Sequence, residues 1–260
     1  MHKIKKSIGQ NFLINKKLKN DIISYLNPSK KNTILEIGPG TGILTKNIAP
    51  LAKTLLLVEL DKTLIPILKE KLKKFTNIII YNQDILKVDI KKITNNKSVR
   101  IIGNIPYNIS TEIIYKLSKY KNIIDIFLMI QKEVAERIII SHIKKNYSKF
   151  SIITNYKFKI KKLIHTIGPE NFFPKPKVNS SFIKLVPKKH KYKILNYEIF
   201  KKIIYMAFNN RRKKISITLK KINMTKIIYT NQNKRAEDIT INMYIMISNL
   251  YYKLNKRLDH

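Results

Sequence analysis

Short apolar runs alternate with amphipathic runs between about residues 30 and 130, and this alternation limits the possible folds more than any other feature. The apolar runs have the length and the Ile, Leu and Val content of strands, and they cover 33–37, 54–59, 77–81, 99–103 and 123–130. Apolar residues recur at helical spacing near 43–51, 62–73, 110–120 and 132–140. Apolar strands that alternate with helices are typical of a parallel sheet covered on both faces. We therefore predict an α/β fold built on a mostly parallel sheet.

The pattern changes after a proline-containing segment at 172–177. Residues 178–186 predict one more strand, and 187–191 predict a linker. Beyond the linker, 194–221 and 238–254 show helical periodicity and no strand alternation. These observations predict two domains, an α/β domain over 1–189 and a small, basic, all-α domain over 190–260.

The chain carries 53 Lys and Arg against 16 Asp and Glu, which gives a formal net charge of +37. Such an excess attracts polyanions, with nucleic acid as the first candidate and an anionic membrane surface as the second. Lys, Asn and Ile are frequent along the whole chain, so a codon bias of the genome explains much of the charge equally well. Charge alone therefore does not identify the partner.

Several classes of site and segment are missing from the sequence. The absence of Cys excludes disulfides, thiolate metal sites and Cys nucleophiles, and it suits a reducing cytosol. The longest apolar run, 123–130, contains Asp125 and is much shorter than the roughly 20 residues of a spanning helix. We expect no membrane segment, no signal peptide and no metal site. The histidines lack ligand spacing and are His2, His142, His165, His190 and His260.

A glycine-rich segment, Glu36-Ile37-Gly38-Pro39-Gly40-Thr41-Gly42, follows the first predicted strand and precedes a predicted helix. Glycines at such a turn let the backbone bend sharply and let a ligand approach closely, and the helix start offers free N–H groups. The spacing is G-x-G-x-G and not the G-x-G-x-x-G of dinucleotide enzymes. We therefore predict that Gly38 and Gly40 bind an adenosine-containing cofactor other than a nicotinamide.

Two acidic residues stand at the ends of the next two strands. Glu59 comes 21 residues after Gly38, where a carboxylate can accept hydrogen bonds from both ribose hydroxyls. Asp84 follows the third strand and can accept a hydrogen bond from an adenine amino group. Each acid alone could be a solvated charge or a helix cap. Their joint position at the carboxyl ends of parallel strands favours a cofactor site.

The segment Asn104-Ile105-Pro106-Tyr107 follows the fourth strand and is similar to the motif of S-adenosylmethionine-dependent methyltransferases that modify exocyclic amines. With other segments it resembles the ribosomal RNA adenine dimethyltransferase family over essentially the whole chain. The C-terminal segments favour the small-subunit branch over the large-subunit erythromycin-resistance methylases. The other segments that carry the resemblance are 9–13, 38–42, 108–111, 131–133, 172–180, 208–213 and 235–239.

The resemblance implies a Rossmann-like class I methyltransferase domain, with a mostly parallel seven-stranded sheet, followed by a small all-α domain. It implies an enzyme that uses S-adenosyl-L-methionine to dimethylate the N6 amines of two adjacent adenosines. These adenosines lie in the 3′-terminal hairpin of 16S small-subunit ribosomal RNA, and the reaction takes place during subunit biogenesis, in a pre-30S-type particle. We expect a cytoplasmic monomer without membrane contact.

The chemistry of an adenine amine explains the reaction motif, because its nitrogen lone pair is delocalised into the ring. If the Asn104 side-chain oxygen and the Ile105 carbonyl accept its two hydrogens, the nitrogen can pyramidalise and attack a methyl group in line. Pro106 stiffens the turn, and Tyr107 offers an aromatic face to a flipped-out base. The resemblance implies that Phe172 covers the other side of the adenine; both rings could instead be core aromatics.

The resemblance also implies cofactor contacts by Asn11, Leu13 and Asn104. Glu36 is either under the methionine end of the cofactor or a structural acid at the strand end.

The chain departs from the family pattern at 147–151, where Tyr-Ser-Lys-Phe-Ser replaces Tyr-Gly-Arg-Leu-Ser. The change puts a local turn and a bidentate Arg contact in doubt, since Lys is a point charge. We predict that the basic run 211–214, with Lys5 and Lys6, binds phosphates and is not merely a solvated helix face. Two other functions stay open: a large-subunit (23S) ribosomal RNA adenine N6-methyltransferase, and a non-catalytic nucleic-acid-binding factor with the same fold.

Overall fold

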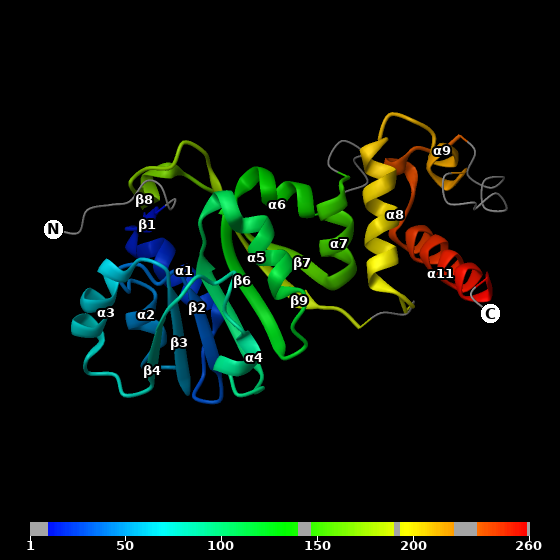
Figure 1. Cartoon of the computed structure of the whole chain (residues 1–260). Coiled ribbons are helices and arrows are strands. Elements are labelled where there is room, and N and C mark those ends of the chain that lie inside the picture. Colours follow the sequence, from blue (N-terminus) through cyan, green and yellow to red (C-terminus); the bar gives the residue numbers. More distant parts are fainter. Residues whose placement is uncertain (1–9, 140–146, 190–192, 221–232, 259–260) are drawn as a thin grey trace. The chain divides into compact units, whose positions relative to one another are not determined.

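The computed structural model describes residues 10–139, 147–189, 193–220 and 233–258 (Figure 1). The chain forms two compact units, which we call the α/β unit (1–136 and 158–187) and the helical unit (137–157 and 188–260). The sequence predicted one boundary at 189–190, with 137–157 in the first domain. In the structure, residues 137–139 and 147–157 group with the later helices.

A seven-stranded sheet forms the centre of the α/β unit. Its strand order is β4-β3-β2-β5-β6-β9-β7, and β9 is antiparallel to both of its neighbours while the first five strands are parallel. The mostly parallel seven-stranded sheet is therefore confirmed. The strands are β2 (Thr33–Ile37), β3 (Thr54–Glu59), β4 (Ile78–Asn82), β5 (Val99–Asn104), β6 (Ile123–Gln131), β7 (Phe158–Ile167) and β9 (Ser180–Pro187).

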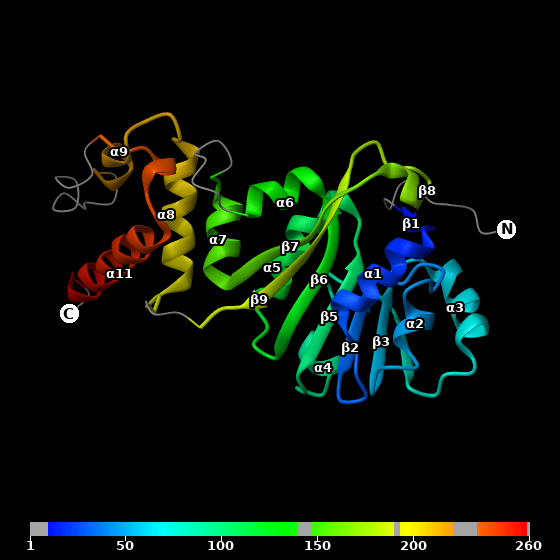
Figure 2. The same ribbon diagram turned by 180° about the vertical axis from the view of Figure 1, so that it is seen from behind.

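Helices cover both faces of this sheet (Figures 1 and 2). On one face lie α1 (Lys16–Leu26), α2 (Thr45–Ile48) and α3 (Ile65–Leu72), and their apolar side chains form one core with β2, β3, β5 and β6. On the other face lie α4 (Ile90–Ile93) and α5 (Ser110–Leu117). The 3-10 helix η2 (Lys62–Leu64) leads into α3, and α6 (Lys132–Ile138) follows β6.

The helix α1 shows how local sequence sets these elements. The Asn15 side chain caps its start by accepting a hydrogen bond from the Leu18 N–H at 3.0 Å. Leu18, Ile22 and Leu26 recur every four residues and are buried against the sheet. The helix ends at Asn27, which takes the left-handed conformation common at helix C-termini.

A second sheet joins the start of the chain to a distant segment. Strand β1 (Phe12–Leu13) pairs antiparallel with β8 (Phe172–Phe173), and the two strands lie side by side in Figures 1 and 2. Leu13 lies opposite Phe172, and both side chains are buried in the main core. Just beyond β1, the Ile14 N–H donates to the Asn171 carbonyl at 2.9 Å. The sequence did not predict this sheet.

The helical unit contains α7 (Lys149–Lys157), α8 (Tyr197–Asn209), α9 (Ile215–Lys220), the 3-10 helix η6 (Ala236–Asp238) and α11 (Ile241–Leu258). An aromatic cluster of Tyr147, Phe208 and Tyr244 lies in its interior. The Tyr147 hydroxyl donates to the Ile239 carbonyl at 2.8 Å, and burial raises the pKa of Tyr147 above its usual range. The expected helical character of the C-terminal region is present in the described parts of 194–258.

The unusual residues at 148 and 149 have partners in this unit. The Ser148 and Ser151 hydroxyls each accept a hydrogen bond from the other residue's N–H, so Ser148 caps α7 where the family has Gly. Lys149 donates to the Asn209 side chain at 2.7 Å and lies 4.6 Å from the centre of the Tyr205 ring. Lys149 therefore bonds to α8, so its charge has a structural role within the unit.

Some elements differ from prediction. The strand β7 was not predicted, because lysines interrupt its apolar pattern, and α1, α4 and α7 were also missed. The helix expected at 43–51 is only four residues long, and the periodicity at 194–221 is divided between α8 and α9. None of the helices among the described residues is long and apolar enough to cross a membrane.

Candidate active site

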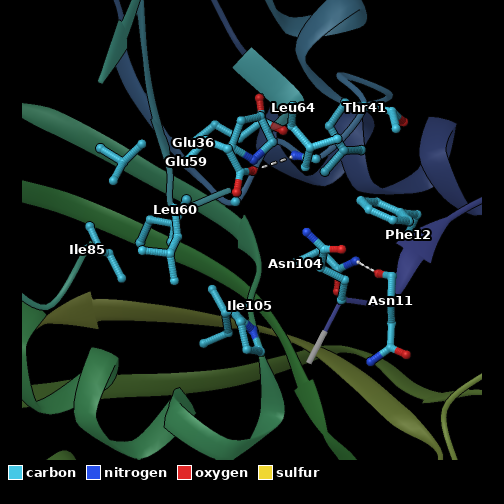
Figure 3. A pocket seen from close by; sticks show the side chains of 18 of the residues that line it. Asn11, Phe12, Glu36, Thr41, Glu59, Leu60, Leu64, Ile85, Asn104 and Ile105 are labelled. Carbon is cyan, nitrogen blue, oxygen red and sulfur yellow. Dashed lines mark hydrogen bonds between the residues drawn. The ribbon is translucent and has the colours of Figure 1, made fainter. Parts of the chain in front are cut away.

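A pocket opens at the carboxyl ends of β2, β3, β4 and β5 (Figure 3). Nine of the predicted site residues line it: Asn11, Leu13, Gly38, Gly40, Glu59, Asp84, Asn104, Ile105 and Pro106. The parallel sheet thus brings together side chains that are distant in sequence.

The glycine-rich turn forms one wall. Gly38 and Gly40 have φ of +65° and +57°, the left-handed region that glycine adopts without strain. A Cβ on Gly40 would lie 2.8 Å from the Phe12 ring, so the turn and the N-terminal segment touch here. The helix α2 begins only at Thr45, and the Gly40 N–H donates to a carboxylate.

That carboxylate belongs to Glu59, at the end of β3 (Figure 3). Its Oε2 accepts from the Gly40 N–H at 3.1 Å, and its Oε1 accepts from the Asp61 N–H at 2.9 Å. Burial raises the pKa of Glu59, while these N–H groups act in the opposite direction by favouring the charged form. A carboxylate offers about four acceptor positions, so Glu59 keeps capacity to accept from a ligand hydroxyl.

Glu36 lies under the same turn and lines the pocket. Burial raises the pKa of its carboxyl to about 7, the Thr45 hydrogen bond lowers it and the nearby Glu59 charge adds to the rise. The Thr45 hydroxyl donates to its Oε2 at 2.8 Å. Both readings made from the sequence remain compatible with this position, because Glu36 has a structural partner and also faces the pocket.

Another wall of the pocket follows the end of β4 and contains Asp84. One oxygen of Asp84 accepts from the Leu86 N–H at 2.8 Å, which holds the turn in shape. Ile85 comes next and is 6% exposed, while Leu60, directly after Glu59, is 51% exposed although it lines the pocket. Sequence reasoning missed both apolar residues. The signal was an apolar residue directly after each predicted acid.

Asn104 ends β5 and faces the N-terminal segment across the pocket (Figure 3). Its Nδ2 donates to the Asn11 backbone carbonyl at 2.7 Å. A carbonyl can only accept, so this bond fixes which end of the amide is nitrogen and leaves Oδ1 as an acceptor. Ile105 and Pro106 follow in the pocket wall, and a Cβ on the preceding Gly103 would lie 2.9 Å from the Ile37 carbonyl oxygen.

The two predicted aromatic residues do not line this pocket. Tyr107 begins the 3-10 helix η3 (Tyr107–Ile109), and its hydroxyl shares a hydrogen bond with the Ser180 hydroxyl. Burial raises the pKa of Tyr107. Phe172 is completely buried in the main core, whereas its neighbour Phe173 is 59% exposed. The structure does not bring Phe172 to the pocket, and its covering of an adenine stays a prediction.

The N-terminal segment contributes two residues that sequence reasoning gave no role, Gln10 and Phe12. Gln10 Nε2 donates to Asp61 Oδ2 at 2.9 Å. Asp61 is 2% exposed, and its other oxygen accepts from the Thr63 N–H and hydroxyl. Because the Asp61 N–H also holds Glu59, Gln10 connects to the predicted ribose-binding carboxylate through one residue.

The predicted phosphate-binding run is only partly available. Arg211 forms a 2.6 Å ion pair with Glu237, which compensates its charge. Arg212 is exposed, and Lys214 donates to the Asn233 side chain at 2.9 Å. The predictions for Lys5 and Lys6, and the Gly9 of the first motif, lie outside the described residues.

No group of three or more potential metal ligands occurs in the described part of the chain. Of the five histidines, only His165 lies within it. The other four lie outside the described residues, and the absence of a metal site stays a prediction.

Comparisons with known proteins agree with one another. Residues 1–253 match the family model described as ribosomal RNA adenine dimethylase. Two similar proteins, from Francisella tularensis subsp. novicida and subsp. holarctica, are named ribosomal RNA small subunit methyltransferase A. Each is 37% identical over 255 residues, covering 95% of this chain and 97% of the relative.

Solved structures show the same fold. A dimethyladenosine transferase from Plasmodium falciparum is 26% identical, with a TM-score of 0.80, and the match covers 93% of this chain and 98% of that one. The 23S rRNA methyltransferase ErmE is 22% identical with a TM-score of 0.69, covering 96% and 100%.

Proposed function

The chain belongs to the ribosomal RNA adenine dimethylase family, and on that basis we propose which RNA it modifies and how its residues act. It is an S-adenosylmethionine-dependent ribosomal RNA methyltransferase, and its reaction is dimethylation of adenine N6 amines in 16S small-subunit RNA. The finer assignment is that the two target adenosines are adjacent and lie in the 3′-terminal hairpin. The relatives named for the small subunit match 95% of the chain, which favours this assignment over the large-subunit alternative.

One observation carries the mechanism: the Asn104 amide nitrogen is already bound to the Asn11 carbonyl. Its oxygen is thereby held as an acceptor in the wall of the pocket. With the Ile105 carbonyl, it can accept both hydrogens of an adenine amine. The nitrogen then keeps its lone pair for attack, and the enzyme acts through position and electrostatic complementarity.

The pocket fits S-adenosylmethionine, which supplies an electrophilic methyl group when bound. Glu59 binds the ribose hydroxyls, and Asp84 binds the adenine amino group. Leu60 and Ile85, on the same two turns, pack against the flat adenine ring. Gly38 and Gly40 allow close backbone approach, and Asn11 and Leu13 close the pocket from the N-terminal segment.

The same adenine nitrogen receives two methyl groups, so the hydrogen bonds to Asn104 and Ile105 differ between the first and the second transfer. An amine that already carries one methyl has one hydrogen left, so only one of the two acceptors can be satisfied in the second transfer. The site must therefore tolerate a methyl beside Asn104 or Ile105. Pro106 keeps both acceptors aimed, and Tyr107 is assigned to one face of the base. No strong base is needed, because the methylated amine cation loses its proton readily.

The proposal also covers the ribosomal particle that is the substrate, the location of the reaction and the oligomeric state of the enzyme. We assign the reaction to a pre-30S-type particle in the cytoplasm, carried out by a monomer. Cytoplasmic ribosome assembly and the absence of Cys support this location. The high positive charge supports RNA as the partner in either unit.

The deciding experiment measures methyl transfer to small ribosomal subunits and, in parallel, to large-subunit RNA, both from cells that lack this protein. Mass spectrometry of the product should find dimethyladenosine in the small-subunit RNA, and its appearance only in large-subunit RNA would favour the alternative. Calorimetry with S-adenosylmethionine distinguishes the enzyme from a non-catalytic nucleic-acid-binding factor, because such a factor would not bind the cofactor. Asn104→Ala should bind the cofactor and fail to transfer the methyl group.

A further inference from the structure

The segment 173–178, between β8 and β9, carries an exposed aromatic ring next to two lysines; we call it the 173–178 loop. Phe173 is 59% exposed, whereas the adjacent Phe172 is fully buried. Val178, at the other end of the loop, is 44% exposed. Single exposed apolar side chains are common on protein surfaces, so the meaning of this exposed ring depends on where the loop lies and on which charges accompany it.

The loop is attached to the active site at both ends. At its start, Phe173 lies opposite Phe12, whose ring touches Gly40 and lines the pocket. After its end, the Ser180 hydroxyl is hydrogen-bonded to the Tyr107 hydroxyl of the reaction motif. The Asn179 carbonyl accepts from the Lys132 N–H at 2.9 Å. The loop therefore borders the wall that holds Asn104.

The charges of the loop complement a polyanion. Lys175 and Lys177 are exposed, and neither forms an ion pair within the described part of the chain. The nearest acid in sequence, Glu170, accepts a hydrogen bond from the Asn171 side chain at 2.9 Å. An exposed aromatic ring followed in the chain by two exposed lysines suits nucleic acid, because bases stack on the ring and phosphates pair with the cations.

We propose that Phe173 stacks on the base of the nucleotide next to the adenosine in the active site, and that Lys175 and Lys177 bind the adjoining phosphates. This inference rests on the proposed function, in which the two target adenosines are neighbours. While one adenine lies beside Asn104, the other remains outside and needs a place close to the pocket. Stacking uses only the flat face of the base, so Phe173 accepts the neighbour before and after methylation.

The first experiment compares variants in methyl transfer to unmethylated small ribosomal subunits. Phe173→Ala should lower kcat/KM by about 5- to 100-fold, mainly through a higher KM, because a lost stack weakens binding. Phe173→Trp should retain activity. The matched control is Tyr25→Ala, which removes a 44% exposed ring from α1. Unchanged kinetics for Phe173→Ala, or an equal loss for Tyr25→Ala, would overturn the proposal.

The lysines are tested by salt dependence of RNA binding. Lys175→Gln with Lys177→Gln should reduce the slope of log affinity against log salt by about two. Lys30→Gln with Lys31→Gln removes the same charge from an exposed turn before β2, at the other end of the parallel strands, and should leave the slope unchanged. If the two double variants have equal slopes, Lys175 and Lys177 are not part of the RNA-binding surface.

A spectroscopic readout uses the absence of tryptophan from the chain. Phe173→Trp creates a single reporter, and stacking of an oligoribonucleotide with two adjacent unpaired adenosines should quench its fluorescence. Tyr25→Trp should not respond. The two possible failures can be told apart. If the proposed function is wrong, the unaltered protein will not transfer methyl groups to small ribosomal subunits. Failure of this inference leaves that transfer and cofactor binding intact.

Discussion

The Asn104 side chain donates its amide hydrogen to the backbone carbonyl of Asn11, a residue 93 positions earlier in the chain. The bond orients the Asn104 side chain, which we assign to the substrate amine. Its partner is the N-terminal segment, which we assign to the cofactor. Both predicted roles of Asn104, at the cofactor and at the amine, are compatible with this geometry. The N-terminal segment therefore acts on the reaction without touching the reacting nitrogen.

Removing the Asn104 side chain should affect the chemical step more than cofactor binding. Asn104→Ala deletes one of two acceptors, and the loss in kcat is expected to be about 100-fold or more. Asn104→Asp keeps an acceptor oxygen and loses the donor to Asn11, so it should retain part of the activity. Rapid-quench kinetics with calorimetry of S-adenosylmethionine binding measures both quantities. Equal losses in kcat and in cofactor affinity would contradict the assigned role.

Glu59 should determine cofactor affinity. Glu59→Ala removes a charged acceptor for two hydroxyls, which is expected to weaken S-adenosylmethionine binding by about 10- to 100-fold. The control is Glu70→Ala, because Glu70 forms an exposed pair with Lys73. Calorimetry is the measurement, and an affinity that does not change on Glu59→Ala would exclude this carboxylate from the ribose site.

Glu36 should make stability depend on pH. Its pKa rises from 4.5 to about 7 on folding, so the folded protein holds this proton more tightly than the unfolded chain. The contribution to stability is complete below about pH 4.5 and is lost as the pH rises through 7. Glu36→Gln, which keeps an acceptor for Thr45, should therefore be more stable than the natural chain at pH 8, by up to about 3 kcal/mol.

Urea unfolding of both proteins between pH 4.5 and 8.5 measures this difference. Glu59 titrates in both proteins, and its charge adds to the rise in the Glu36 pKa, so the difference between the curves reports Glu36 together with its coupling to Glu59. Parallel curves across the whole range would show that Glu36 does not hold a proton in the folded state.

The basic run should contribute less to RNA binding than its sequence suggests. If Arg211 and Arg212 both bound phosphates, replacing both would change the salt slope by about two, but Arg211 is paired with Glu237. Arg212→Ala should lower the salt slope by about one, whereas Arg211→Ala should mainly lower the melting temperature. Filter binding at several salt concentrations and thermal unfolding separate the two effects. A slope change of one for Arg211→Ala would contradict the structural role.

Glu59, Asp84 and Asn104 could be placed from the sequence because they end apolar strands, and a parallel sheet brings strand ends to one edge. The positions of Gln10 and Phe12 in the site could not be predicted, since their partners Asp61 and Gly40 lie far along the chain. The periodicity of apolar residues gives no information about such contacts. The exposure of Phe173 was also hidden, because two consecutive phenylalanines look alike until strand pairing sends them to opposite faces.

The pairing of β1 with β8 has a consequence for synthesis. Phe12 is made early, and its partner Phe173 is among the last residues of the α/β unit. Every cofactor-binding residue proposed above leaves the ribosome before β8 and β9 exist. The strand that pairs with the segment next to Asn11 is therefore still untranslated when all of these binding groups have been made, so β1 gains its sheet partner only after residue 173 has been added.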